Sequence, residues 1–105
     1  MNGNMMGWDL TIPQAISHAE KYNYDGKLIS RELDGSIKET TYGESIKRSK
    51  KLANALSKLG INLHDRVATI AWNNSRHFET YFGVSGMGAV LHTLNPRYSP
   101  AQLVY

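Results

Sequence analysis

The sequence of 105 residues contains no cysteine. A chain without cysteine forms neither a disulfide framework nor a thiolate metal site, so nothing connects it with an oxidising compartment. It also has no apolar run close to the roughly 20 residues that a membrane-spanning helix needs. The first residues lack the basic region and the apolar core of a signal peptide. These absences favour a cytoplasmic protein.

Neither sign of charge dominates the composition. Twelve Lys and Arg residues stand against nine Asp and Glu residues, which gives a net charge of +3. Because the basic residues are spread among the acidic ones, the charge is weak evidence for an anionic partner. A hydrophobic fraction of 41% and a charged fraction of 20% are ordinary for a soluble globular chain and far from the composition of a disordered one.

Three segments carry apolar residues at helical spacing, and residues suited to capping precede them. Thr11 and Gln14 have the spacing of a capping box, as do Thr41 and Glu44, because the members of each pair can satisfy each other's free backbone amides. Gly60 is placed to end the second helix. Helices are therefore expected at about residues 12–22, 42–59 and 75–87.

Two near-continuous apolar runs flank the third of these helices. One covers about residues 66–72 and the other about residues 89–94. Such runs are typical of strands that are covered on both faces. A strand, a helix and a second strand in this order form a βαβ unit, in which the two strands lie parallel in one sheet. The predicted fold class is therefore α/β.

Residues 27–41 show a different pattern, in which charged and apolar residues are mixed. Asp34 and Gly35, in the middle of this segment, form a turn pair that tolerates positive φ. The segment is therefore expected to be a β-hairpin with one wet side, at the periphery of the fold.

Gly83, Gly86 and Gly88 crowd the end of the third helix. A glycine costs a helix up to ~1 kcal/mol against alanine, so we expect these residues to permit close approach of the helix to the sheet and to end the helix. Gly86 and Gly88 do not form a dinucleotide-binding loop, because they close a helix instead of opening one. No phosphate-binding loop of the Gly-Lys-Ser/Thr type is present in the sequence either.

The carboxyl ends of the two predicted strands are the best place for a binding site, because open α/β sheets commonly bind ligands there. Turn residues at a buried strand end produce the same pattern without any ligand, so that alternative stays open. The candidate residues at the two strand ends are Trp72, Asn73, Asn74, His92, Asn95 and Arg97.

No catalytic, cofactor-binding or metal-ligating residue is predicted. The four histidines have no metal-ligand spacing. Ser75 and His77 lie close to Glu79 in the sequence, but Ser75 lacks the strained elbow of a nucleophile, and a capping role already explains it.

Six short motifs occur in order along the chain: Thr41-Tyr42-x-Glu44, residues 52–56, Leu59-Gly60, residues 65–68, residues 86–90 and Asn95-Pro96-Arg97. Together they resemble the amino-terminal region of AMP-forming acyl-CoA synthetases, which are adenylate-forming enzymes. The likeness covers nearly the whole chain. Residues 71–73, 76–77 and 92–97 are most similar to the branch that acts on medium- or long-chain fatty acids and on short carboxylates such as methylthiopropionate.

The resemblance implies that residues 1–105 form the N-terminal part of an AMP-binding synthetase/ligase domain. A complete relative would use ATP, Mg²⁺ and CoA to convert a carboxylate first into an acyl-adenylate and then into an acyl-CoA thioester. The family's phosphate loop, ribose-binding Asp and catalytic Lys have no counterpart in these residues, so the segment alone is expected to be inactive. Its expected partners are a small carboxylate substrate and the remainder of the synthetase chain, with no nucleic acid.

His64 is a departure from the family pattern, because similar proteins usually carry glycine before Asp65-Arg66-Val67. If the loop needs a positive φ at this position, histidine tolerates it less well than glycine.

Ser99 and Gln102 have the spacing of a helix start, with Pro100 at the first helical position. A helix over residues 100–105 is too short to be stable alone in water. The chain is therefore expected to be part of a larger protein.

Two other hypotheses stay open. Lys47, Lys51 and Lys58 lie on one helix face, which could make the chain a small α/β binding module for an acidic partner, although such a face is usually a solvated one. The chain could also be a truncated product without a function of its own.

Overall fold

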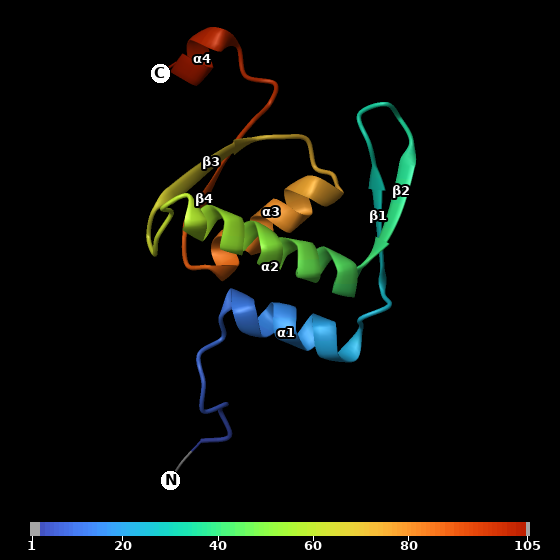
Figure 1. Ribbon diagram of the computed structural model, residues 1–105, viewed down its shortest axis with the longest axis vertical. Helices are drawn as coiled ribbons and strands as arrows, with labels where there is room; N and C mark the ends of the chain where they lie inside the picture. The colour runs from blue at the N-terminus through green and yellow to red at the C-terminus, as the bar shows by residue number, and fades with distance from the viewer. Residues whose placement is uncertain (1–2, 105) are drawn as a thin grey trace.

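Helices and strands alternate along much of the chain, and the α/β fold class is confirmed. The computed structural model describes residues 3–104 (Figure 1). Tyr105, which was expected in the last helix, lies outside the described residues. Within residues 3–104, no helix is both long and apolar enough to cross a membrane. The elements are α1 (Ile12–Tyr22), β1 (Lys27–Arg31), β2 (Ile37–Thr41), α2 (Tyr42–Lys58), β3 (Arg66–Ile70), α3 (Ser75–Gly86), β4 (Val90–Leu94) and α4 (Pro100–Val104).

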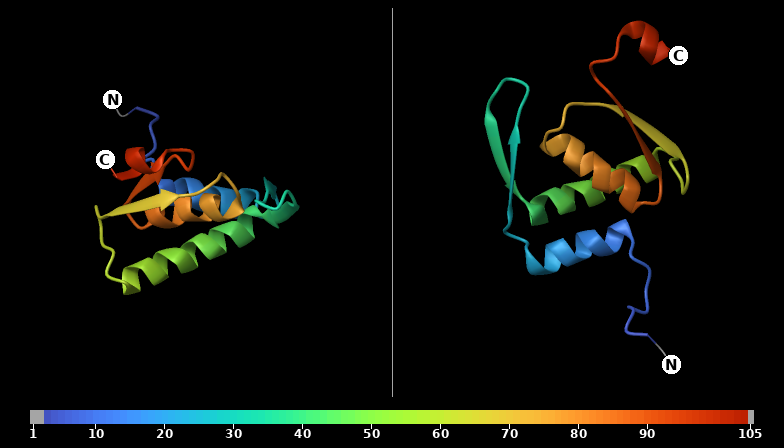
Figure 2. Two further views of the ribbon diagram at one scale, coloured as in Figure 1. Left: turned by 90° about the horizontal axis from the view of Figure 1, so that it is seen from above. Right: turned by 180° about the vertical axis from the view of Figure 1, so that it is seen from behind.

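Strands β3 and β4 form a parallel pair, as the βαβ pattern predicts. Val67 lies opposite Leu91, and Thr69 lies opposite Thr93. Helix α3 connects the two strands and lies between their sheet and helix α2 (Figure 2). Strands β1 and β2 form a separate antiparallel hairpin beside the helices. Helix α1 packs against both α2 and α3.

Small residues bring α2 and α3 close together. Ser45 and Ser49 of α2 are almost completely buried, as is Val84 of α3. A Cβ atom at Gly83 would lie 3.0 Å from the carbonyl oxygen of Ser49, so only glycine fits this contact without a shift. The prediction for the glycines was therefore wrong about the partner: Gly83 permits close approach of α3 to α2, not to the sheet. The sequence pattern could not identify the partner, because both neighbours lie against the same helix.

An ion pair also connects α2 and α3. Arg48 of α2 donates a hydrogen bond from Nε to Oε1 of Glu79 of α3 at 2.8 Å. The Glu79 residue is only 7% exposed, so it needs this partner more than a surface carboxylate would. The hydrogen bond to Glu79 and the negative charge of that group raise the pKa of Arg48 above its ordinary value.

The sheet is covered on one face only, so the expectation of strands buried on both faces is wrong for residues 3–104. Val67 and Leu91 are partly covered, whereas Ile70 is 58% exposed and Val90 is 49% exposed. Side chains along a strand alternate between the two faces, and α3 packs on only one of them. The uncovered face carries the apolar residues Ala68, Ile70 and Val90 beside Arg66 and His92, and these apolar residues explain why the sequence pattern predicted burial.

The two predicted capping boxes have different outcomes. At α2, the Glu44 amide donates to Thr41 Oγ1 at 3.1 Å and the Thr41 amide donates to Glu44 Oε2 at 3.4 Å, which confirms the box. At α1, Thr11 makes no side-chain cap bond, so that box was wrong. The Gln14 amide, which the box would direct to the Thr11 side chain, donates to the backbone oxygen of Thr11 instead, at 3.1 Å.

Several element ends differ from the expected positions by one or two residues. Strand β3 ends at Ile70, so Trp72 lies in the loop after the strand. Leu59, the last residue of the helix expected at 42–59, follows the last helical residue and is exposed. Gly60 adopts a φ of +94°, the left-handed conformation typical of the residue after a helix end.

His64 occupies the loop between α2 and β3 with a φ of +70°. Its amide donates to the carbonyl oxygen of Gly88 at 3.0 Å, which ties this loop to the loop before β4. The left-handed conformation is costly for residues with a Cβ atom. The departure from glycine at this position therefore places strain in the loop.

We predict that His64→Gly stabilises the protein by about 0.5–1 kcal/mol. Relief of the left-handed strain, roughly 1–2 kcal/mol, outweighs the greater freedom that glycine gives the unfolded chain. Urea unfolding followed by circular dichroism measures the difference. His92→Gly, in the extended backbone of β4, is the matched control and should lower stability. Destabilisation by both variants would contradict the strain at His64.

The hairpin turn is held by Asp34 and Ser36. Both the amide and the hydroxyl of Ser36 donate to Asp34 Oδ1, at 2.9 Å and 2.6 Å. The Ser36 hydroxyl and then its amide lower the pKa of Asp34 below the ordinary value of 3.8. Gly35 between them has a φ of +85°, as the turn prediction required.

We predict that Ser36→Ala raises the pKa of Asp34 towards 3.8, because the first of the two causes is removed. Since the folded-state pKa lies below the unfolded one, the charged carboxylate supports the turn at neutral pH, and this support fades as the pH falls through the folded-state pKa. Carboxyl-carbon NMR over a pH series measures the change. Ser57→Ala on α2 is the control and should leave the Asp34 titration unchanged; an unchanged pKa in Ser36→Ala would contradict the assignment.

Candidate functional site

A hollow of about 640 Å³ lies at the carboxyl ends of β3 and β4. We call it the carboxyl-edge hollow. Its floor and walls come from the loop after β3, one face of α3 and the loop after β4. The lining residues are Ala71, Trp72, Asn73, His77, Tyr81, Thr93, Leu94, Asn95, Pro96, Arg97 and Tyr98.

Arg97 and Trp72 pair across the two loops. The guanidinium carbon of Arg97 lies 5.2 Å from the centre of the Trp72 ring, which is within the range of a cation–π contact. The backbone amide of Arg97 donates to Asn95 Oδ1 at 2.9 Å, and this bond shapes the turn that carries the guanidinium. Both side chains remain exposed to solvent. The hollow therefore presents a positive charge and an aromatic face to any ligand.

His77 is held by both ring nitrogens. Nδ1 lies 3.1 Å from Asn73 Oδ1, and Nε2 lies 3.3 Å from Thr69 Oγ1. A carboxamide oxygen can only accept, so the contact with Asn73 is a hydrogen bond when Nδ1 carries the hydrogen, whereas the Thr69 hydroxyl can donate to Nε2 or accept from it. The two contacts hold the ring in place, and it connects α3 with the loop after β3 and with β3 itself.

Four of the six candidate residues line the hollow. Trp72 and Asn73 lie on its β3 side, and Asn95 and Arg97 lie on its β4 side. His92 does not line it, because this residue pairs with Ala68 in the middle of the sheet, two positions before the end of β4. Its assignment to the strand end was therefore wrong.

Asn74, the sixth candidate, caps α3 instead of lining the hollow. Its Oδ1 accepts from the His77 amide at 3.1 Å. Its Nδ2 lies 3.5 Å from Glu32 of the hairpin, and the Ser75 hydroxyl donates to the same carboxylate at 3.2 Å. Asn74 thus fixes the start of α3, and through it the position of His77.

Sequence reasoning missed three side chains of the hollow, namely His77, Tyr81 and Tyr98. His77 and Tyr81 lie one turn apart on α3, with ring centres 6.2 Å apart. That spacing puts both on one helix face, which is a usable signal. Tyr98 lies in the loop after β4, where the sequence gives no periodicity to reveal its direction.

No cluster of three or more His, Cys, Asp or Glu side chains in residues 3–104 could hold a metal ion. Ser75 is buried and bonded to Glu32, so it does not serve as a nucleophile. The arrangement of a cation, aromatic rings and amides is suited to binding an anionic or planar group. The fold and the hollow therefore define an α/β segment with an open hollow at the carboxyl edge of its parallel sheet.

The chain belongs to the AMP-binding enzyme family, whose family model matches residues 17–105. The resemblance inferred from the six motifs is confirmed. The family match does not favour an independent basic binding module.

Curated relatives agree with this assignment. A 3-methylmercaptopropionyl-CoA ligase of Ruegeria lacuscaerulensis is 45% identical over 105 residues, which is 100% of this chain and 20% of that protein. A medium-chain-fatty-acid–CoA ligase of Ectopseudomonas oleovorans is 44% identical over 100% of this chain and 19% of that protein. The chain thus spans about a fifth of the length of these relatives.

A solved structure shows the same fold. The Brucella canis acyl-CoA synthetase superposes with a TM-score of 0.75 over 90% of this chain and 17% of that one, at 20% identity. The chain therefore has the fold of the N-terminal portion of adenylate-forming enzymes.

We predict that Asn74→Ala lowers stability by about 1 kcal/mol, because α3 loses its N-cap. Asn73→Ala is the matched control: it removes an exposed bond to His77 and no helix cap, so its cost should be at most about half as large. Denaturant unfolding of both variants measures the difference. Equal losses would contradict the capping role of Asn74.

Proposed function

We propose that residues 1–105 form the N-terminal part of the AMP-binding domain of an acyl-CoA ligase. The observation that carries this proposal is the 45% identity along the whole chain to a 3-methylmercaptopropionyl-CoA ligase. The similar identity to a medium-chain-fatty-acid–CoA ligase supports fatty acids or related short carboxylates as the substrate class. We place the enzyme in the cytoplasm and in fatty acid metabolism.

The proposed reaction has two steps. A carboxylate oxygen attacks the α-phosphorus of ATP, so that an acyl-adenylate forms and pyrophosphate leaves. The sulfur of CoA then attacks the acyl carbonyl carbon, the thiol proton is released, and AMP leaves as the thioester forms. Phosphate displacement of this kind depends mainly on positioning and on neutralisation of charge.

This segment contributes the lining of the carboxyl-edge hollow and one positive charge to that chemistry. Arg97 attracts an anionic part of the substrates, and Trp72 holds the guanidinium in place through the cation–π contact. The described residues do not fit a Mg²⁺ site, because they offer no cluster of carboxylates. The remainder of the synthetase chain is the proposed partner that supplies ATP and metal binding, and the segment alone is proposed to be inactive.

A chimera tests the proposal. The matching segment of the Ectopseudomonas oleovorans ligase is replaced by residues 1–105 of this chain, and formation of acyl-CoA from a medium-chain fatty acid, ATP and CoA is measured. We expect activity within about tenfold of the parent ligase, because the shared fold preserves the contacts with the rest of the enzyme. A folded chimera without adenylation would contradict the proposal.

Arg97→Gln in the chimera tests the role of the carboxyl-edge hollow. Loss of one charged contact to a substrate should raise a KM by about tenfold. Arg66→Gln is the matched control, since Arg66 lies at the opposite, amino end of β3 and is also exposed. Equal effects of the two variants would show that Arg97 acts only through the overall charge.

A further inference from the structure

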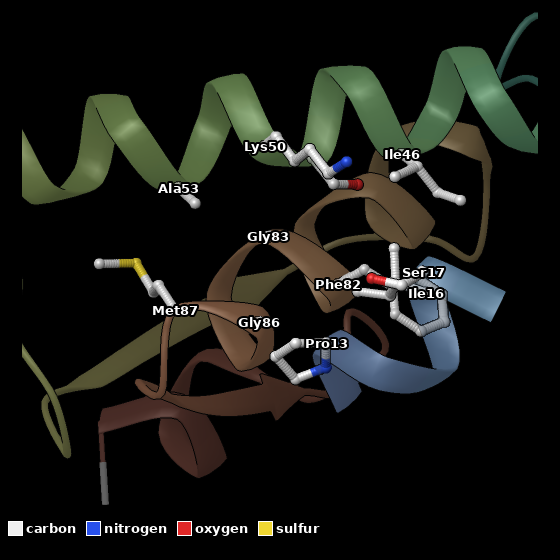
Figure 3. A pocket seen from close by; sticks show the side chains of 11 residues that line it. Pro13, Ile16, Ser17, Ile46, Lys50, Ala53, Phe82, Gly83, Gly86 and Met87 are labelled. Carbon is white, nitrogen blue, oxygen red and sulfur yellow. The ribbon is translucent and has the colours of Figure 1, made fainter. Parts of the chain in front are cut away.

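A second cavity, of about 210 Å³, lies between the three helices, away from the carboxyl-edge hollow. We call it the interhelical cavity. Figure 3 shows its lining: Ile46 of α2, Phe82 of α3 and Ile16 of α1 lie toward one end, and Ala53 of α2 and Met87 lie toward the other. It shares no lining residue with the carboxyl-edge hollow. The full lining is Pro13, Ile16, Ser17, Ile46, Ser49, Lys50, Ala53, Phe82, Gly83, Gly86 and Met87.

The polar groups on α2 beside this cavity already have partners. Lys50 Nζ donates to Glu20 Oε2 at 2.6 Å, which compensates the charged group of the lining. The Ser49 hydroxyl donates to the Ser45 backbone oxygen at 2.9 Å. Among the α2 residues of the lining, the charge of Lys50 is therefore paired and the Ser49 hydroxyl is bonded, so a charged ligand would lose its hydration with little compensation.

The volume is suited to a small hydrocarbon. An apolar cavity of about 150 Å³ in another protein stays dry and binds benzene. At 210 Å³, the interhelical cavity has room for roughly six to eight carbon atoms by the same measure. Helix α1, which forms one wall, has no buried residue, so this wall is the most weakly held of the three.

We propose that the interhelical cavity binds a small uncharged apolar molecule, aromatic or branched, of about benzene size or slightly larger. Such a molecule supplies the dispersion contacts that α1 lacks and holds α1 against α2 and α3. The proposal rests on this cavity alone and is independent of the ligase function.

The experiment titrates the 105-residue chain with benzene and follows methyl NMR signals. We expect saturable shifts at Ile16, Ile46 and Met87, with the signals of Ile29 in the hairpin unchanged. Benzoate, the charged probe of the same shape, should bind at least about tenfold more weakly, because its carboxylate meets no free cation and lies near Glu20. No saturable shift with benzene, or equal binding of benzoate, would overturn the proposal.

Two substitutions locate the site. Ala53→Leu fills the cavity with three more carbon atoms and should weaken benzene binding by at least tenfold. Ala55→Leu, the same change on the exposed side of α2, should leave binding unchanged. If Ala53→Leu does not fold, Gly86→Ala is the second test of the site. Its added Cβ would lie 3.7 Å from Ile16 Cδ1, which is an ordinary contact. This variant should weaken benzene binding several-fold. Binding unaffected by a folded cavity variant would refute the site.

Discussion

The close contact between α2 and α3 is the constraint on which the other elements depend. Ser45, Ser49 and Gly83 leave little side-chain volume between the two helix backbones, and the Arg48–Glu79 pair closes the contact at its polar side. Helix α3 also packs against the sheet and against α1. A chain of this size has a small core, so one well-packed helix pair accounts for much of its order.

The carboxyl-edge hollow depends on the same helix. Asn74 and Glu32 set the beginning of α3, and the helix then presents His77 and Tyr81 to the loops after β3 and β4. The hairpin thus contributes to the hollow without lining it, because Glu32 reaches α3 from the end of β1. The geometry of the hollow is therefore determined by contacts between segments that are about 40 residues apart in the sequence.

Local features of the fold could be predicted from the sequence because neighbouring residues determine them. The Thr41–Glu44 capping box and the Asp34–Gly35 turn are of this kind. Contacts between elements could not be predicted in the same way. The sequence did not reveal that Gly83 faces α2, that the Gln14 amide bonds to the backbone of Thr11 and not to its side chain, or that His92 lies inside the strand.

The candidate site was predictable to the extent that it depends on strand ends. Trp72, Asn73, Asn95 and Arg97 follow the two strands directly, so parallel pairing brings them together. His77, Tyr81 and Tyr98 join the hollow through packing of a helix and a loop, which the pattern of apolar residues does not encode.

The uncovered face of the sheet has a consequence for how the protein opens locally. In the part of the chain that the structure describes, β3 and β4 have only each other as hydrogen-bonding partners, and one of their faces meets water. The backbone amides of these strands therefore need only a local opening of low free energy to exchange hydrogen with solvent. The amides of α2 and α3 need an opening of higher free energy. The sheet is accordingly expected to open more readily than the pair of α2 and α3. The carboxyl-edge hollow is lined from both parts, by α3 and by the ends of β3 and β4.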